Sequence, residues 1–233
     1  MPSFRTGVVT ELLEERRGLQ RITVDGERAY VLTQLIGAVA LGDRVVVNTT
    51  AVDLGLGTGG WHVVHWNLRH PDERWSEPGP GHIMKLRYTS LQVDTGAGEE
   101  GVELPTSLER TPVVACALHS QVPIVAVVVK HLRPDANLVY VMTDGGSLPI
   151  ALSDTVHQLC TKGLIDRTIT AGHAFGGDVE AVNVHAALAL AVHHGADVVI
   201  AGIGPGVVGT GTKLGHTGLD VVTTADATAA LGG

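Results

Sequence analysis

The stretch from Ala196 to Gly218, ADVVIAGIGPGVVGTGTKLGHTG, indicates the fold class of the chain. Its first six residues are apolar except for one aspartate and have the length of a buried strand. Seven glycines follow between Gly202 and Gly218. Many α/β proteins use a strand that runs into a glycine-rich loop to present backbone N–H groups to an anion. The stretch therefore predicts an α/β domain with an anion-binding loop after this strand.

Residues 109–233 alternate between predicted strands and predicted helices. Continuous apolar runs are typical of parallel strands that are covered on both faces, and right-handed crossovers between them give a Rossmann-like sheet. The chain stops where a fifth strand would follow, so we expect an incomplete sheet or a truncated chain. The predicted strands are 113–118, 138–143, 167–170 and 196–201; the predicted helices are 122–132, 153–162, 178–194 and 219–231, with Ser153 and Asp178 as N-caps.

Residues 1–95 have the pattern of a small antiparallel β-barrel or sandwich, because short strands recur between turn signals. Asp25-Gly26 predicts a hairpin. Residues 69–82 are polar and proline-rich and predict an exposed connection, and the acidic, glycine-rich residues 96–108 predict a linker between the two domains. A second glycine-rich loop, 54–60, is a wide turn or part of a ligand site. The predicted strands are 4–10, 19–24, 28–32, 44–49, 61–66 and 83–89.

Composition limits the functional classes. The chain has 233 residues, is 44% hydrophobic and carries a net charge of −8 without a basic stripe, so we do not expect nucleic acid as a partner. Cys116 and Cys160 lie in apolar surroundings and predict buried thiols in a reducing compartment. The run from Pro112 to Val129 is interrupted by polar residues and Pro123, so no membrane span is expected. We expect a cytoplasmic protein and leave open whether it forms homo-oligomers.

Four loops follow the predicted parallel strands and therefore meet at one sheet edge, where α/β proteins bind ligands. We predict a small anionic ligand there, with Asp144, His119 and His173 as catalytic candidates. Asp144 also fits an Asx-turn or a metal ligand. The predicted ligand-binding residues are Ser120, Thr143, Gly145, Gly146, Gly176, Gly177, Glu180, Asn183, Gly204, Gly206, Gly209, Thr210, Gly211 and Thr212.

The first loop residues of the opening stretch, Gly204 to Gly209, match the dinucleotide fingerprint G-x-G-x-x-G, and Asp226 follows at about the required distance. However, the fingerprint needs a helix that starts inside the motif, and the residues that follow are poor helix formers. Thr212-Lys213 also reverses the order that a phosphate-binding P-loop requires. The loop therefore fits a phosphate or carboxylate bound by backbone N–H groups, or a cover loop without a ligand.

Three further groups leave alternatives open. His173, Asp178 and Glu180 fit a small metal site, although Asp178 also fits a helix cap. Glu180 and Asn183 are predicted to share one helix face near the ligand. Ser120 with His119 and Asp144 has the residue types of a hydrolytic triad but lacks the G-x-S-x-G elbow. The sequence does not identify a cofactor.

Five motifs resemble an uncharacterised bacterial family that is classed only as a domain of unknown function. The resemblance spans the chain and implies a cytosolic bacterial protein, with no activity attached. Members of that family extend further at the C-terminus with a His/Ser-rich segment. The motifs are GHIMKLRYTSLQ from Gly81, LHS from Leu118, YVMTDGG from Tyr140, GHAFGGDVEAVN from Gly172 and GPGVVGTGT from Gly204.

The sequence thus favours an enzyme that binds a small phosphorylated or carboxylated metabolite at the strand ends. A ligand-sensing or scaffold module without catalysis is the first alternative, and an NAD(P)-type dinucleotide-binding protein is the second.

Overall fold

The computed structural model describes residues 1–69 and 84–233, and the chain divides into two units, Met1–Pro78 and Gly79–Gly233. The predicted exposed connection at 69–82 lies outside the described residues except for its first residue. Each unit has its own sheet and its own core.

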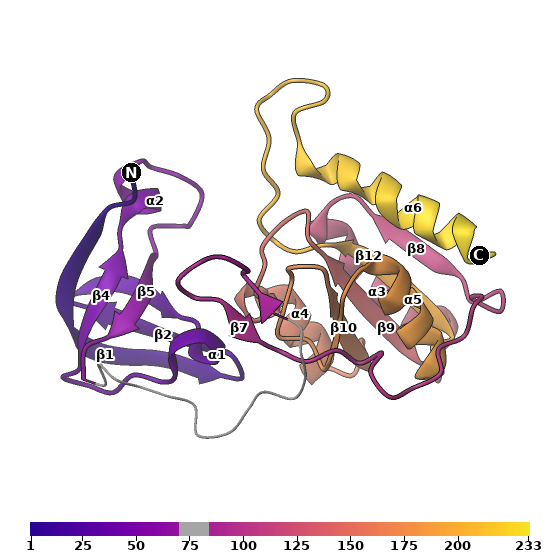
Figure 1. Ribbon diagram of the computed structural model, residues 1–233, viewed down its shortest axis with the longest axis horizontal. Coiled ribbons are helices and arrows are strands. Elements are labelled where there is room, and N and C mark those ends of the chain that lie inside the picture. Colours follow the sequence, from indigo (N-terminus) through magenta and orange to yellow (C-terminus); the bar gives the residue numbers. More distant parts are fainter. Residues whose placement is uncertain (70–83) are drawn as a thin grey trace. The chain divides into compact units, whose positions relative to one another are not determined.

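Unit 1 is a closed five-stranded barrel (Figure 1). The strands follow the order β1-β2-β3-β5-β4 around the barrel, and every pair is antiparallel except β3 with β5. Of the two predicted alternatives, a barrel or a sandwich, the barrel is confirmed. Its elements are β1 (Phe4–Arg16), β2 (Leu19–Val24), β3 (Glu27–Val31), α1 (Thr33–Ile36), β4 (Arg44–Asn48), α2 (Thr50–Asp53) and β5 (His62–Asn67).

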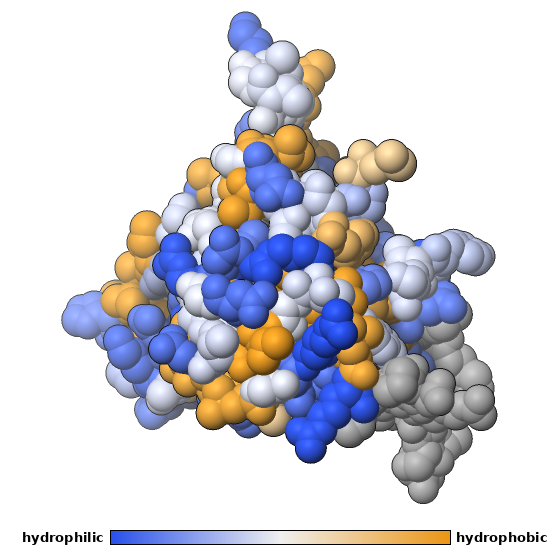
Figure 2. Space-filling view, turned by 90° about the vertical axis from the view of Figure 1, so that its left-hand side faces the viewer, coloured by the Kyte–Doolittle hydropathy of each residue, from blue (hydrophilic) through white to orange (hydrophobic). Residues whose placement is uncertain are grey.

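The period of two residues in these strands builds the barrel core. Val45 and Val47 are fully buried, whereas Val46 between them is only partly buried. Asp25 and Gly26 both have positive φ, 50° and 83°, as the predicted tight hairpin between β2 and β3 requires. Outside the core, β1 exposes Phe4, and Figure 2 shows apolar side chains interspersed with polar ones on the face turned to the viewer.

Unit 2 contains a five-stranded parallel sheet in the order β11-β10-β9-β12-β8. This is the predicted Rossmann-like α/β arrangement. A separate two-stranded antiparallel ribbon, β6 (Met84–Lys85) with β7 (Val93–Asp94), precedes it in the chain. The sheet strands are β8 (Val113–Cys116), β9 (Leu138–Thr143), β10 (Arg167–Ala171), β11 (Val179–Ala181) and β12 (Val198–Ile203).

Helices cover both faces of this sheet, so alternate residues of one strand enter different cores. Val139 and Val141 of β9 join the core under α5 (Val184–His193) and α6 (Val221–Ala230). Tyr140 between them joins the core under α3 (Val122–Leu132) and α4 (Asp154–Thr161). Three short 3-10 turns complete the unit: η1 (His119–Gln121), η2 (Ile150–Leu152) and η3 (Thr217–Asp220).

The predicted helix 178–194 is wrong in its first turns. Residues Val179–Ala181 form the edge strand β11, which pairs with β10, and the helix begins only at Val184. Asp178 is not its N-cap, because its carboxylate accepts hydrogen bonds from the backbone and hydroxyl of Thr168. Asn183 is the cap and accepts from Ala186 N. The sheet thus has five strands among the described residues, where the sequence predicted four.

Two further predictions need correction. The strand expected at 83–89 ends after Lys85, because Leu86 and Tyr88 adopt positive φ angles of 51° and 63°. The predicted linker 96–108 packs on unit 2: Gly98 N donates to Glu180 O at 2.7 Å, and Leu108 is fully buried in the core. A Cβ on Gly98 would lie 2.3 Å from Val179 Cγ1, so glycine at this position lets the segment cover the edge strand β11 closely.

Cys116 is buried as expected, but Cys160 is exposed. On α4, Val156 and Leu159 face the core, which leaves the next residue on the outer side. No helix among the described residues has both the length and the apolar character needed to cross a membrane.

Candidate functional site

A cavity of about 670 Å³ lies in unit 2 at the carboxyl ends of β9, β10 and β11. The first turns of α5 and α6 form its other walls. This is the edge at which parallel α/β sheets bind ligands. The lining consists of Arg87, residues 143–145, 171–173 and 182–185, and Asp220, Thr223 and Thr224.

Asp144 is the exposed carboxylate at the end of β9. Its Oδ1 accepts two backbone hydrogen bonds, from His173 N at 2.6 Å and from Ala174 N at 2.9 Å. Its Oδ2 accepts no hydrogen bond from the residues that the structure describes. Asp144 therefore fixes the loop after β10 with one oxygen and keeps the other available to a ligand.

Two glycines make room for this arrangement. A Cβ on Gly172, which has φ +66°, would lie 2.2 Å from Asp144 Oδ2. A Cβ on Gly145 would lie 2.5 Å from Ile203 Cγ2 and 2.8 Å from the Oδ2 of Asp220. These distances are far below van der Waals contact, so a side chain at position 172 would displace Asp144, and one at position 145 would displace both Ile203 and Asp220.

His173 is held from two directions. Its backbone N–H donates to Asp144, and its ring Nε2 lies 3.1 Å from Arg87 Nη2. A guanidinium can only donate, so Nε2 is the acceptor and the imidazole proton resides on Nδ1. Arg87 thus places a permanent positive charge in the cavity wall and sets the tautomer of the histidine beside it.

Lys85, two residues before Arg87, is completely buried behind this wall. Its ammonium donates to three backbone carbonyls, those of Gly172, Ala174 and Ala181, at 2.6, 3.0 and 3.2 Å. It also lies 3.4 Å from Oε2 of Glu180. Burial lowers the pKa of Lys85 and raises the pKa of Glu180, although the opposite charges of the pair counteract both shifts.

The first turn of α5 contributes hydrogen-bond donors. Asn183 caps the helix through Ala186 N, which leaves the amides of Val184 and His185 without a partner among the described residues. Both residues line the cavity. The N-terminal turn of α5, with its positive dipole end and two N–H groups without a partner, therefore borders the same cavity as Arg87.

The glycine-rich loop after β12 has a different environment. Residues 205–214 are all exposed, and none of them lines the cavity. Several of its N–H groups are used inside the loop: Thr210 N donates to Gly215 O, Thr217 N to Val208 O, and Gly215 N to the hydroxyl of Thr212. In Figure 1 it is the long excursion between β12 and α6. The loop forms a small hairpin of its own rather than a wall of the cavity.

The structure places the remaining loop glycines close to backbone. Gly204 and Gly206 pack against Ser147, and Gly146 packs against Gly204, so the loops after β9 and β12 touch. Gly177 N donates to the hydroxyl of Thr170, next to Gly176. Gly209 pairs with His216 in the hairpin base, and Gly211 is in open space.

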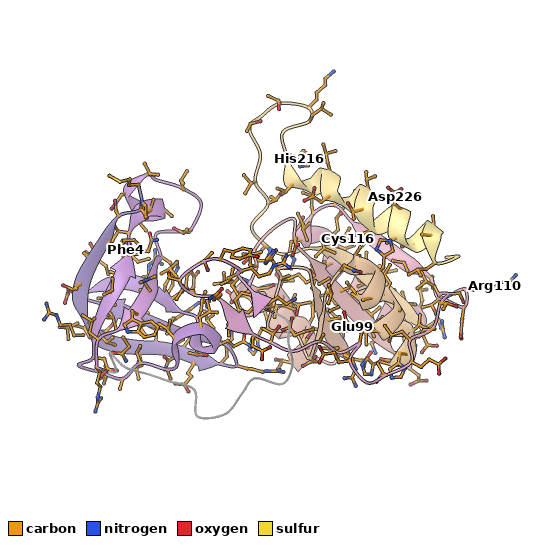
Figure 3. All side chains as sticks on the ribbon, viewed as in Figure 1. Phe4, Glu99, Arg110, Cys116, His216 and Asp226 are labelled. Carbon is orange, nitrogen blue, oxygen red and sulfur yellow. The ribbon has the colours of Figure 1, made fainter. Side chains whose placement is uncertain are left out.

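The dinucleotide fingerprint lacks its structural context. No helix begins inside Gly204–Gly209, and the next helical turn is η3. Asp226 lies on α6 rather than at a strand end (Figure 3).

His119 and Ser120 are separate from the cavity lining. His119 Nε2 lies 2.7 Å from the hydroxyl of Ser153, and its Nδ1 lies 3.1 Å from Ile203 O. Burial lowers the pKa of His119, which favours the neutral ring. Ser153 is 2% exposed and caps α4 through Val156 N, so this pair joins β12 to α4 instead of presenting a nucleophile. The predicted grouping of Ser120, His119 and Asp144 is not formed.

Glu180 and Asn183 do not share a helix face, because Glu180 lies in β11. The carboxylate of Glu180 accepts from Thr170 Oγ1 and from Gly176 N, both at 2.7 Å, and faces Lys85 rather than the cavity. Within residues 1–69 and 84–233, no cluster of three or more His, Cys, Asp or Glu side chains is arranged to hold a metal. The grouping of His173, Asp178 and Glu180 is therefore not a metal site in this structure.

The structure thus brings Asp144, His173, Thr143, Gly145 and Asn183 together around one cavity. Sequence reasoning missed its other polar residues. Lys85 and Arg87 lie on either side of Leu86, whose positive φ interrupts the strand, and their partners lie almost ninety residues away in the chain. The missed residues are Lys85, Arg87, His185, Asp220, Thr223 and Thr224.

Comparison with known proteins gives a family without an activity. No curated protein and no solved structure matches the chain. The model of one family, described as "Protein of unknown function (DUF3866)", matches residues 28–233, which covers most of unit 1 and all of unit 2. The chain therefore belongs to the DUF3866 family of proteins of unknown function.

Proposed function

We propose that unit 2 is an enzyme domain that binds a small phosphorylated or carboxylated metabolite in the cavity beyond β9, β10 and β11. One observation carries this proposal: Arg87, His173 and two unpaired amides of α5 meet in a cavity at the ligand-binding edge of a parallel sheet. Three kinds of donor around one space favour an oxyanion.

The anion of the ligand binds between Arg87 and the amides of Val184 and His185. This position differs from the glycine-rich loop, several of whose N–H groups donate within its own hairpin. The remainder of the ligand extends toward Asp220, Thr223 and Thr224, whose oxygens accept from or donate to hydroxyl groups.

Asp144 is the acid/base candidate. Its Oδ1 is fixed by two N–H groups, so Oδ2 has a defined position in the cavity. A fixed carboxylate oxygen beside a bound metabolite can remove a proton from a hydroxyl or a carbon acid. His173 presents Nδ1–H as a donor that can stabilise the charge formed in that step.

The test is a thermal-shift and calorimetric screen of the protein against sugar phosphates and small carboxylic acids at millimolar concentration. A ligand that binds raises the midpoint of unfolding. Arg87→Met is expected to weaken its binding by roughly 10- to 100-fold, since a hydrogen bond to a charged group is lost. Arg110→Met removes the same charge from a residue outside the cavity lining, on the loop before β8, and is the matched control (Figure 3).

The variant Asp144→Asn distinguishes an enzyme from a ligand-sensing module without catalysis. The asparagine oxygen can still accept from the two amides, so the loop stays fixed while the acid/base group is lost. Turnover that disappears in this variant, with binding retained, supports an enzyme. Binding without turnover in the parent protein supports a ligand-sensing module, and equal affinities for Arg87→Met and the parent protein contradict the proposed anion site.

A further inference from the structure

The residues behind the cavity wall form a hydrogen-bond network that has no direct part in the proposed function. The segment Lys85–Arg87, which we call the strap, lies next to the loop 172–174 although the two are far apart in the chain. The strap contacts that loop in two places: Lys85 contacts it from the protein interior, and Arg87 contacts it at the cavity surface.

The peptide group between Gly172 and His173 is the centre of this contact. Its carbonyl oxygen accepts from Lys85 Nζ at 2.6 Å, and its N–H donates to Asp144 Oδ1 at 2.6 Å. A cation on one side and a carboxylate on the other polarise the same peptide, so each hydrogen bond strengthens the other. Ala174 adds two further hydrogen bonds through two different peptide groups: its N–H donates to Asp144, and its carbonyl accepts from Lys85.

The same ammonium reaches the neighbouring strand. Its third carbonyl partner is Ala181 at the end of β11, and its ionic partner Glu180 is tied to Thr170 and Gly176. Lys85 therefore joins the end of β10, the loop after it and the end of β11, which together make one side of the cavity.

We infer that Lys85 is a positioning residue of the cavity, acting through the peptide between Gly172 and His173 to hold Asp144 with Oδ2 directed to the ligand. This inference rests on the proposed function for the identity of the site. Gly172 is required in this network, because a Cβ at this position would occupy the place of Asp144 Oδ2. The backbone of the strap supports this inference, since the positive φ at Leu86 lets Lys85 point into the core and Arg87 line the cavity, although two residues at this spacing in a regular strand would share one face.

The test uses Lys85→Met combined with Glu180→Gln, which removes both charges and leaves no buried carboxylate without its cation. The matched control is Lys130→Met combined with Asp166→Asn. Lys130 also donates to a carbonyl, that of Ala136, and to a carboxylate oxygen, but this pair lies at the opposite, amino end of the sheet. Urea unfolding of all variants establishes that they fold.

Two readouts distinguish positioning from general stability. In ¹H–¹⁵N spectra of the whole chain, the amide protons of His173 and Ala174 are expected to move upfield in the Lys85/Glu180 variant, because their bonds to Asp144 lengthen. The affinity for inorganic phosphate, measured by calorimetry, is expected to fall by roughly tenfold, because Lys85 no longer anchors the strap that carries Arg87. The Lys130/Asp166 variant is expected to change neither readout.

Unchanged amide shifts in the folded Lys85/Glu180 variant overturn the inference. If the parent protein binds no anion, the proposed function fails, while the amide shifts still decide the role of Lys85. If the variant does not fold, amide exchange in the parent protein decides: protection of His173 and Ala174 equal to that of strand amides supports the inference, and exchange as fast as in residues 205–214 overturns it.

Discussion

The glycine-rich segment after β12 and the cavity beyond β9, β10 and β11 lie at the same edge of one sheet, but they differ in what surrounds their donors. The glycine segment has many N–H groups, and several of them bond within its hairpin. The cavity has fewer glycines, but two of them are crowded by side chains: Gly172 by Asp144, and Gly145 by Ile203 and Asp220. A large number of glycines in a segment therefore indicates a loop with few backbone restrictions. In the candidate site, by contrast, the informative glycines are those where a Cβ would collide with a side chain of the cavity wall.

The largest expected effect concerns the charge behind the cavity. Lys85→Met leaves Glu180 buried without its cation, and we expect a loss of about 3–5 kcal/mol of unfolding free energy. Lys213→Met, in the glycine segment, is expected to change it by less than about 0.5 kcal/mol. Urea denaturation of both variants measures the difference, and equal stabilities would contradict a structural role for the buried ammonium.

The second prediction compares two glycines with similar backbone angles. Gly172 and Gly211 have φ of 66° and 77°, but only Gly172 has a neighbour within contact distance, the carboxylate of Asp144. Gly211→Ala is expected to cost about 1 kcal/mol for the backbone alone. Gly172→Ala is expected to cost about 2–4 kcal/mol, because it adds overpacking against Asp144. Similar losses for both variants would show that Asp144 can move aside without cost.

The third prediction concerns the root of the glycine segment, where His119 binds Ile203 O and the hydroxyl of Ser153. Burial lowers the pKa of His119 below its ordinary 6.5, so the unfolded chain takes up a proton on this ring at a higher pH than the folded protein does. The stability that the neutral ring contributes is complete above pH 6.5 and is lost as the pH falls from there through the folded pKa.

Chemical denaturation at several pH values between 5 and 8 measures this slope. His119→Gln removes the titrating ring, so the loss of stability below pH 6.5 is expected to be smaller in the variant than in the parent protein. A slope that is identical in the two proteins would assign the pH dependence to other groups.

The smallest effect is expected in the hairpin itself. Thr212→Val removes the hydroxyl that accepts from Gly215 N, and this exposed bond contributes about 0.5–1 kcal/mol at most. The affinity of the cavity for a ligand found in the screen is expected to remain within about twofold, since residues 205–214 do not line it. A large loss of affinity would show that the glycine-rich segment contributes to ligand binding.

Local signals predicted much of the fold. The five barrel strands, the Asp25-Gly26 hairpin, α3 and the Ser153 cap of α4 follow from periodicity and capping, which depend on neighbours in the sequence. The start of α5 was predicted wrongly because Asp178 has the chemistry of a cap. Its carboxylate is instead taken by Thr168 of the preceding strand, a partner that no local rule identifies.

The sequence by itself determined that the chain has a β-rich first part, a parallel α/β second part, and loops with polar residues at one sheet edge. These properties depend on side-chain period and turn chemistry, which are local. Only the tertiary structure decided which loop borders the cavity, that Lys85 and Arg87 join it, and that His119 does not. Those outcomes depend on hydrogen bonds between residues that are far apart in the chain. The free-energy cost of burying a charge without a partner is larger than the free energy of any local conformational preference, so these distant bonds decide the arrangement.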